Sequence, residues 1–235
     1  MQDFTQAFSL AFNLMLSADA DLLEIIGLSL RVSLMAIALS AAIGLPIGAA
    51  IGMSRFRGRS AAIILLNALM GLPPVVVGLC VYLMLSRAGP MGWLGLLYSP
   101  TAMIIAQSIL ITPIIAALSR QVIEDLHIEY AEQFRSLCVP PLAAISALLW
   151  DARYGLLTVA LAGFGRAVAE VGAVIMVGGN IEHLTRVMTT AIALETSKGD
   201  LALALALGIV LLSIALIVNA AVMGLKMTAA RFAYA

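Results

Sequence analysis

The sequence predicts an all-α integral membrane protein with five transmembrane helices and a short interfacial helix at its N-terminus. Hydrophobic residues make up 63% of the chain and charged residues only 11%, whereas soluble domains carry about 25% charged residues. Five apolar stretches are each long enough to cross a hydrocarbon layer of about 30 Å as a helix. The formal net charge is zero, so nothing in the composition indicates nucleic acid as a partner.

Residues 2–16 come first and place their apolar side chains at the i, i+3, i+4 spacing of an amphipathic helix. This spacing predicts a helix that lies in the membrane interface. Packing of the same face against neighbouring spans explains the pattern equally well.

The spans follow in order, and we treat residues 1–235 as a single transmembrane domain. Pro73 and Pro74 interrupt the second span, because a proline lacks the amide donor and disfavours helix at the residue before it. Lipid cannot satisfy the freed carbonyl groups, so this break is expected to face protein or a water-filled cavity. Pro113 is expected to kink the third span. The five spans are expected at about 22–53, 61–86, 100–119, 154–177 and 201–225.

The distribution of Lys and Arg predicts the orientation of the chain. With five spans, eight basic residues fall on one side of the membrane and three on the other. The richer side is predicted to be cytoplasmic. This places the loop at 128–153 and the C-terminus inside the cell, and the N-terminus outside.

Motifs of soluble catalysis do not occur in the sequence. The chain has no GxxxxGK[ST] motif, so it cannot bind ATP through a P-loop of its own. It also has no HExxH, CxxC or GxSxG pattern. His127 and His183 are assigned to opposite sides of the membrane and cannot share a metal. We therefore expect no enzyme activity, no metal site and no cofactor bound by this chain.

The loop at 128–153 carries the strongest functional pattern. It begins with acidic residues, breaks at Pro140-Pro141 and continues as an amphipathic segment. A transporter driven by a separate ATPase needs a rigid element that protrudes from the membrane and docks on that ATPase. A short helix over residues 129–138 would meet this need, although an ordinary solvated connector fits the chemistry equally well.

Residues 129–180 resemble the permease subunits of binding-protein-dependent ABC importers. The cytoplasmic signature of that family is Glu-Ala-Ala, three residues, Gly, nine residues, then Ile-x-Leu-Pro. Glu132, Gln133 and Phe134 take the first three places and Cys138 takes the place of the glycine. The remaining places fall on Leu148, Trp150 and Asp151. The segments GFGRAVAEVGAVIMVGGN (163–180) and TRVMTTAIALETSKGD (185–200) resemble tungstate-type permeases, which are related to molybdate permeases.

This resemblance covers nearly the whole chain and implies a type I importer fold with a coupling helix between the third and fourth spans. It implies a homodimer, two cytoplasmic ATPase subunits that bind ATP and magnesium, and an external oxyanion-binding protein. The implied activity is import of an oxyanion across a bacterial or archaeal plasma membrane, with tungstate as the first choice and molybdate or another oxyanion as the alternative. The residues expected to contact the ATPase are Glu129, Glu132, Gln133, Phe134, Arg135, Leu137 and Cys138.

A second set of residues is expected to line the substrate path or its gate. Arg166 and Glu170 lie four residues apart and so share one helix face, and ionised residues within spans face the bundle interior or water. A neutralising pair that holds helices together is the favoured interpretation, and a positive lining for an oxyanion is the other. The hydroxyl groups of the threonines between residues 185 and 190 are suited to lining the external mouth of the path. Capping of backbone groups in the loop explains the presence of these threonines equally well. The complete set is Pro73, Pro74, Arg166, Glu170, Asn180, Thr185, Thr189 and Thr190.

Two other classes of function remain open. One is a secondary transporter that couples transport to protons through Glu170. The other is a membrane scaffold that contains no substrate path.

Overall fold

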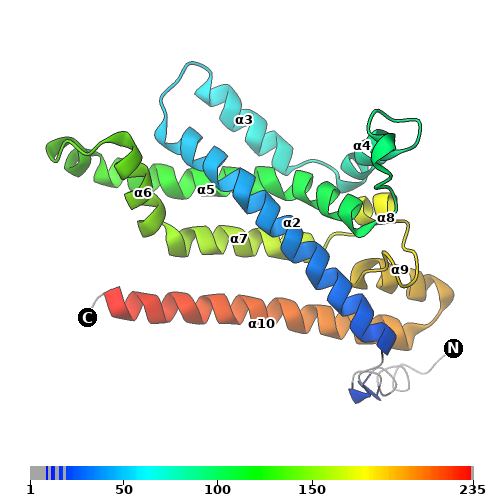
Figure 1. The fold of residues 1–235 in the computed structure, drawn as a ribbon. Helices are drawn as coiled ribbons and strands as arrows, with labels where there is room; N and C mark the ends of the chain where they lie inside the picture. Colours follow the sequence, from blue (N-terminus) through cyan, green and yellow to red (C-terminus); the bar gives the residue numbers. More distant parts are fainter. Residues whose placement is uncertain (1–8, 10–11, 14–15, 18–19, 234–235) are drawn as a thin grey trace. The chain divides into compact units, whose positions relative to one another are not determined.

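The computed structural model describes residues 9, 12–13, 16–17 and 20–233. Within these ranges the chain is helical and contains no β-strand (Figure 1). The interfacial helix expected at residues 2–16 lies largely outside the described residues. The elements are α2 (Ala20–Met53), α3 (Arg59–Met70), α4 (Pro74–Leu85), η1 (Gly92–Leu94), α5 (Pro100–Ser136), α6 (Pro141–Asp151), α7 (Arg153–Val168), α8 (Gly172–Gly178), α9 (Met188–Lys198) and α10 (Leu201–Ala233).

Helices α2, α5 and α10 are each long and apolar enough to cross a membrane, α10 over Leu201–Gly224. Two further spans result if α3 with α4, and α6 with α7, are each counted as one interrupted span. The chain forms two compact units, which we describe separately. Unit 1 contains residues up to Ala36, Pro73–Gln107 and Gly165–Ala220. Unit 2 contains Ile37–Leu72, Ser108–Phe164 and the residues from Ala221 onward.

The break in the second span is confirmed. Helix α3 ends at Met70, and the amide of Gly71 donates to the Ala68 carbonyl at 3.1 Å. Helix α4 begins at Pro74, where the missing amide costs nothing because the first amides of a helix have no intrahelical acceptor.

The segment predicted as the fourth span, 154–177, is interrupted in the structure. Helix α7 ends at Val168 and α8 begins at Gly172. Glu170 lies in the interruption, and its Oε1 accepts a hydrogen bond from the Ala173 amide at 2.9 Å. The carboxylate therefore serves the exposed amides at the start of α8, where a negative charge is favourable.

Helix α5, which was predicted as the third span, continues well past the predicted end at residue 119. Residues 129–136 form its last two turns, so the prediction of a separate coupling helix at 129–138 is wrong. Neither Gly nor Pro occurs between residues 114 and 139, so nothing in the backbone ends the helix earlier. Cys138 ends it with a φ of 50°, while the Val139 amide donates to the Phe134 carbonyl at 3.0 Å. This is the left-handed terminus at which glycine is usually found.

Unit 2 is held together by close contact between the second half of α2 and the second half of α5. Gly44, Gly48 and Gly52 follow each other at intervals of four and lie against α5. A Cβ atom at Gly48 would lie 2.5 Å from the Ala116 carbonyl oxygen. Small residues allow this approach, as in many helix pairs within membranes. The neighbouring core of this unit consists of Ala49, Ile123, Leu148 and Ala152.

Unit 1 has its own apolar core between the start of α2, α9 and α10. The buried residues of this core are Leu22, Ile25, Met188, Ala191, Ala206 and Leu207. Helices α4 and α8 pack beside each other in the same unit. Gly78 makes this possible, because a Cβ atom there would lie 2.8 Å from the Cα atom of Ala173.

Candidate functional site

The ion pair predicted between Arg166 and Glu170 is present. Arg166 Nη1 donates to Glu170 Oε2, and the other carboxylate oxygen caps α8. The Glu170 side chain is 3% exposed, whereas that of Arg166 is 32% exposed. A buried carboxylate with two donors is a structural anchor, and the guanidinium keeps part of its surface open.

The two helix breaks of unit 1 lie beside each other. A Cβ atom on Gly172, at the start of α8, would lie 2.7 Å from Val75 Cγ2, in the first turn of α4. Pro73 is exposed and Pro74 is half-buried at that turn. Interrupted helices whose ends converge are typical of substrate or ion paths in transporters. The predicted path residues Pro73, Pro74, Arg166 and Glu170 therefore share one region of unit 1.

A small polar cavity lies next to Glu170 and is lined by side chains of α2, α5 and α9, including Ser29, Ser33, Gln107 and Thr189. The space open to the centre of a water molecule is about 10 Å³, which is about what one water requires. Gln107 Nε2 donates to the Ala167 carbonyl at 3.1 Å. Its buried Oε1 has no partner among the described residues, so the cavity offers an acceptor that suits a single water.

The predicted threonines are committed to the backbone of unit 1. Thr185 Oγ1 donates to the Gly178 carbonyl at 2.6 Å and accepts from the Ile181 amide at 2.9 Å. Thr190 Oγ1 accepts from the Val187 amide at 3.1 Å. Thr189 Oγ1 donates to the Glu170 carbonyl at 2.8 Å. In this conformation these hydroxyl groups brace the segment between α8 and α9.

Asn180 lies at the turn after α8 with a φ of 50°. Its Nδ2 reaches the Thr190 carbonyl at 3.5 Å, and its buried Oδ1 has no partner within the described ranges. Asn is among the few residues other than glycine that adopt this left-handed conformation readily.

The predicted ATPase contact residues lie on the last two turns of α5 and the turn that follows. Six of the seven are exposed, namely Glu129, Glu132, Gln133, Arg135, Leu137 and Cys138. Phe134 is half-buried, because its ring packs on Tyr130 at a centroid distance of 5.8 Å and on the core of unit 2. Leu137 is 74% exposed and is the prominent apolar side chain of this segment.

Helix α6 is fixed to the end of α5 by contacts that the sequence pattern did not indicate. Tyr130 Oη donates to Asp151 Oδ2 at 2.9 Å. The Leu148 side chain of α6 is 1% exposed in the unit 2 core. Arg153 stacks on Trp150 and Tyr154, with 4.7 Å and 4.6 Å from its Cζ to the ring centroids. The end of α5, α6 and the start of α7 thus form one rigid element.

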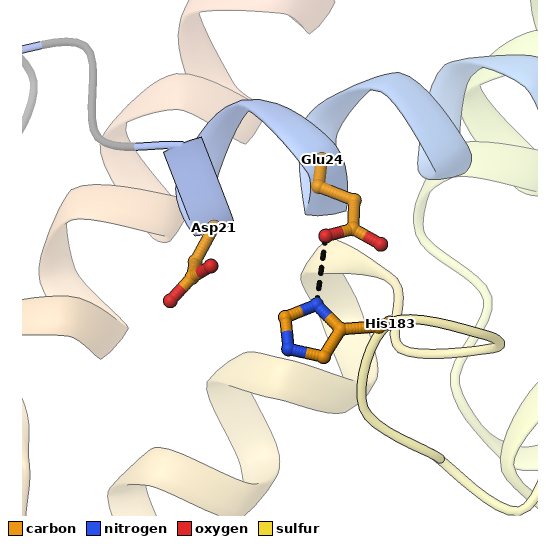
Figure 2. Close-up of side chains that lie close together, drawn as sticks. All are labelled: Asp21, Glu24 and His183. Atoms are coloured by element: carbon orange, nitrogen blue, oxygen red, sulfur yellow. Dashed lines mark hydrogen bonds and ion pairs between the residues drawn. The ribbon is translucent and has the colours of Figure 1, made fainter.

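A third cluster joins the start of α2 to the turn before α9. His183 Nδ1 and Glu24 Oε2 are 2.8 Å apart, with Asp21 beside them (Figure 2). One potential ligand atom of each residue lies within 4.8 Å of the others. A metal requires a neutral imidazole, but the Glu24 hydrogen bond, with Asp21 and Glu182 nearby, raises the pKa of His183. The geometry therefore favours a proton-dependent ion pair.

This ion pair predicts that the stability of unit 1 depends on pH. Because the pKa of His183 is raised above its ordinary value of 6.5, the contribution is complete below that value and is lost as pH rises through the folded pKa. We expect Glu24→Gln to lower the melting temperature at pH 6 and to leave it unchanged at pH 9. Thermal unfolding of the two purified proteins across this range checks the prediction, and an equal shift at both pH values would contradict it.

Comparison with known proteins gives relatives along nearly the full chain. The tungstate uptake system permease protein TupB of Peptoclostridium acidaminophilum is 40% identical over 226 residues, which cover 96% of this chain and 99% of the relative. A probable anion ABC transporter permease protein of Haloferax volcanii is 42% identical over 204 residues, which cover 85% of this chain and 88% of the relative. The TupB protein of Campylobacter jejuni is 37% identical and covers 96% and 92%. No protein-family model matches the chain.

Proposed function

Because the chain belongs to the family of ABC transporter permeases that includes the tungstate uptake system permeases, we propose that it is the membrane subunit of a tungstate importer. The observation that carries this proposal is identity of 40% over 96% of the chain with a tungstate uptake permease. Molybdate is the alternative substrate, because it is also a tetrahedral dianion of similar size. The chain is a transport subunit in the plasma membrane, with its N-terminus outside.

The complete importer contains a second copy of this chain, two cytoplasmic ATPase subunits and an external oxyanion-binding protein. ATP and magnesium bind to the ATPase subunits, and this chain contributes the path and the contact through which the ATPase acts. Two copies related by a two-fold axis enclose a path that one copy of this size cannot enclose alone. ATP binding then favours one of two conformations of the pair, and hydrolysis resets it.

The contact with the ATPase is the rigid element formed by the end of α5, α6 and the start of α7. Its exposed residues Glu132, Arg135 and Leu137 dock on the ATPase, while Phe134 and Tyr130 hold α5 to α6. Cys138 takes the left-handed position at the helix end, which supports its placement at the glycine of the family signature. Movement of the ATPase is then transmitted without bending of the contact.

The path runs along the paired breaks in unit 1. Arg166 is partly open and offers a positive charge, whereas Glu170 is buried and holds the guanidinium in place. The carboxylate cancels part of the attraction for an anion, so binding in the path is weak and substrate selection resides in the external protein. Both Glu170 oxygens already accept hydrogen bonds, which supports an anchor rather than a proton carrier.

ATP-driven uptake in proteoliposomes tests this function. With the ATPase and binding protein reconstituted, we expect accumulation of tungstate that requires ATP and does not respond to a proton gradient. The double substitution Glu132→Arg with Leu137→Asp is expected to reduce ATPase copurification and uptake at least tenfold, because both side chains are exposed and neither supports the unit 2 core. Asp125→Arg, an exposed charge reversal on the same helix face, is the matched control. Equal uptake by the double variant and the control would contradict the proposed contact.

A further inference from the structure

A cavity of about 540 Å³ opens in unit 1, between the end of α4 and the loop that follows it. It is separate in its lining residues from the Arg166–Glu170 region. Ligand pockets usually have about 300–1,000 Å³, so this cavity can hold a small anion together with part of its hydration shell. Its polar and small lining residues are Tyr82, Ser86, Arg87, Gly92, Gly95 and Tyr98.

The walls of this Arg87 pocket are held by backbone contacts. Gly92 lies so close to the preceding turn that a Cβ atom there would be 2.9 Å from the Arg87 Cα atom. The Tyr98 amide donates to the Val177 carbonyl at 2.9 Å, and Tyr98 has a φ of 61°. A Cβ atom on Gly179 would be 2.9 Å from the Tyr98 ring. One wall of the pocket is therefore fixed to the C-terminal end of α8.

The pocket carries positive charge with no described carboxylate against it. No Asp or Glu occurs between residues 25 and 123 of the sequence. Among the described residues, no carboxylate is paired with Arg87, in contrast to Arg59, Arg120, Arg166 and Arg186. A guanidinium remains protonated at all physiological pH values and presents five donors in a planar fork, which suits tetrahedral oxyanions.

Two phenol groups add further donors. The rings of Tyr82 and Tyr98 meet edge to face at a centroid distance of 6.4 Å. A hydrogen bond with Tyr82 raises the pKa of Tyr98 above its ordinary value of 10. The Tyr98 phenol therefore stays protonated near neutral pH, and whichever of the two phenols accepts the mutual hydrogen bond has its own O–H free for a ligand.

We propose that the Arg87 pocket binds a tetrahedral oxyanion and is an entry site that receives tungstate before it reaches the path. This inference rests on the proposed import function, which supplies the anion. One guanidinium and one phenol give weak, reversible binding, as an entry site requires. The phosphate of a lipid headgroup has the same chemistry, and the exposed Trp93 of the same loop would suit an interfacial position. The experiment must therefore distinguish dissolved oxyanion from lipid.

Trp93 provides a local reporter, because the chain has only two tryptophans and the other, Trp150, can be replaced by Phe. The purified Trp150→Phe permease in lipid-free detergent is titrated with sodium tungstate at constant ionic strength while Trp93 fluorescence is recorded. We expect a saturable change whose apparent Kd rises at least tenfold in Arg87→Gln and several-fold in Tyr98→Phe. Arg57→Gln, which removes an exposed arginine from another loop, should change the apparent Kd by less than twofold.

The same titration is repeated in phosphatidylcholine nanodiscs and with short-chain phosphatidylglycerol in detergent. These experiments distinguish binding of dissolved tungstate from binding of a lipid headgroup. Arg87-dependent saturation by tungstate in both detergent and nanodiscs supports the proposal. A response to the lipid with none to tungstate would overturn it, as would identical tungstate curves for the parent and Arg87→Gln. An uptake measurement distinguishes failure of the entry-site proposal from failure of the proposed import function. If the reconstituted parent takes up tungstate but the curves are identical, only the entry site is wrong.

Discussion

Glu170→Ala is expected to destabilise the permease by about 3 kcal/mol and to abolish tungstate uptake. Breaking a buried ion pair by removing one partner typically costs 3–5 kcal/mol, and the lower end applies because Arg166 is 32% exposed. The substitution also removes the acceptor of the Ala173 amide at the start of α8. Unfolding in sodium dodecyl sulfate, followed by circular dichroism, measures the loss of stability.

Glu182→Ala is the matched control for this prediction. Glu182 pairs with Arg186 at 2.9 Å and the same spacing of four residues, but its side chain is 64% exposed. Exposed pairs contribute about 0–1 kcal/mol, so the control should unfold almost like the parent. Glu170→Gln keeps an acceptor for the Ala173 amide and loses only the charge. Its stability should therefore lie between those of Glu170→Ala and Glu182→Ala. Equal stability of Glu170→Ala and Glu182→Ala would show that burial of the pair has no structural importance.

The apolar stretches that form α2, α5 and α10, and the break before α4, could be predicted from the sequence because hydropathy and proline act locally. The Pro73-Pro74 pair removes two donors from any helix that contains it, so the break before α4 needed no tertiary information. In each case the chemistry of a few consecutive residues decides the conformation.

The end of α5 could not be located from charge alone. The acidic residues after His127 indicate where the chain leaves the lipid, but charged residues are also good helix formers. The useful signal was the absence of Gly and Pro until residue 140. The break at Glu170 was hidden for another reason. Its stability depends on a cap within α8 and on contact between Gly172 and Val75, and neither is visible in a periodic pattern.

Part of the candidate site could be predicted because it depends only on local spacing along a helix. The i, i+4 spacing of Arg166 and Glu170 predicted their ion pair, because neighbours on a helix meet whatever surrounds them. The sequence pattern did not indicate Arg87 as a site residue, because its role depends on Tyr82 in α4 and on Tyr98 at the end of the glycine-rich loop that follows α4. The long stretch without acidic residues around it was the available signal.

Gly48→Ala is expected to destabilise unit 2 by about 1–3 kcal/mol or more, the usual cost of overpacking. Its new methyl group would meet the Ala116 carbonyl oxygen at 2.5 Å and the Arg120 amide nitrogen at 3.0 Å. Both are backbone atoms of α5, so no side-chain rotation can relieve the contact. The additional contact with Ser119 Oγ is relieved by Ser119→Gly, and this second substitution should therefore rescue only a small part of the loss.

The control lies on the same helix and uses the same substitution. A Cβ atom on Gly27 would have no heavy atom of another described element within 4 Å, so Gly27→Ala gains helix propensity without a clash. That gain is about 0.5–1 kcal/mol. Gly27→Ala should therefore raise the free energy of unfolding, whereas Gly48→Ala should lower it. Unfolding in sodium dodecyl sulfate measures both variants against the parent. Stabilisation by Gly48→Ala would mean that α2 and α5 are farther apart than the close packing of Gly44, Gly48 and Gly52 requires.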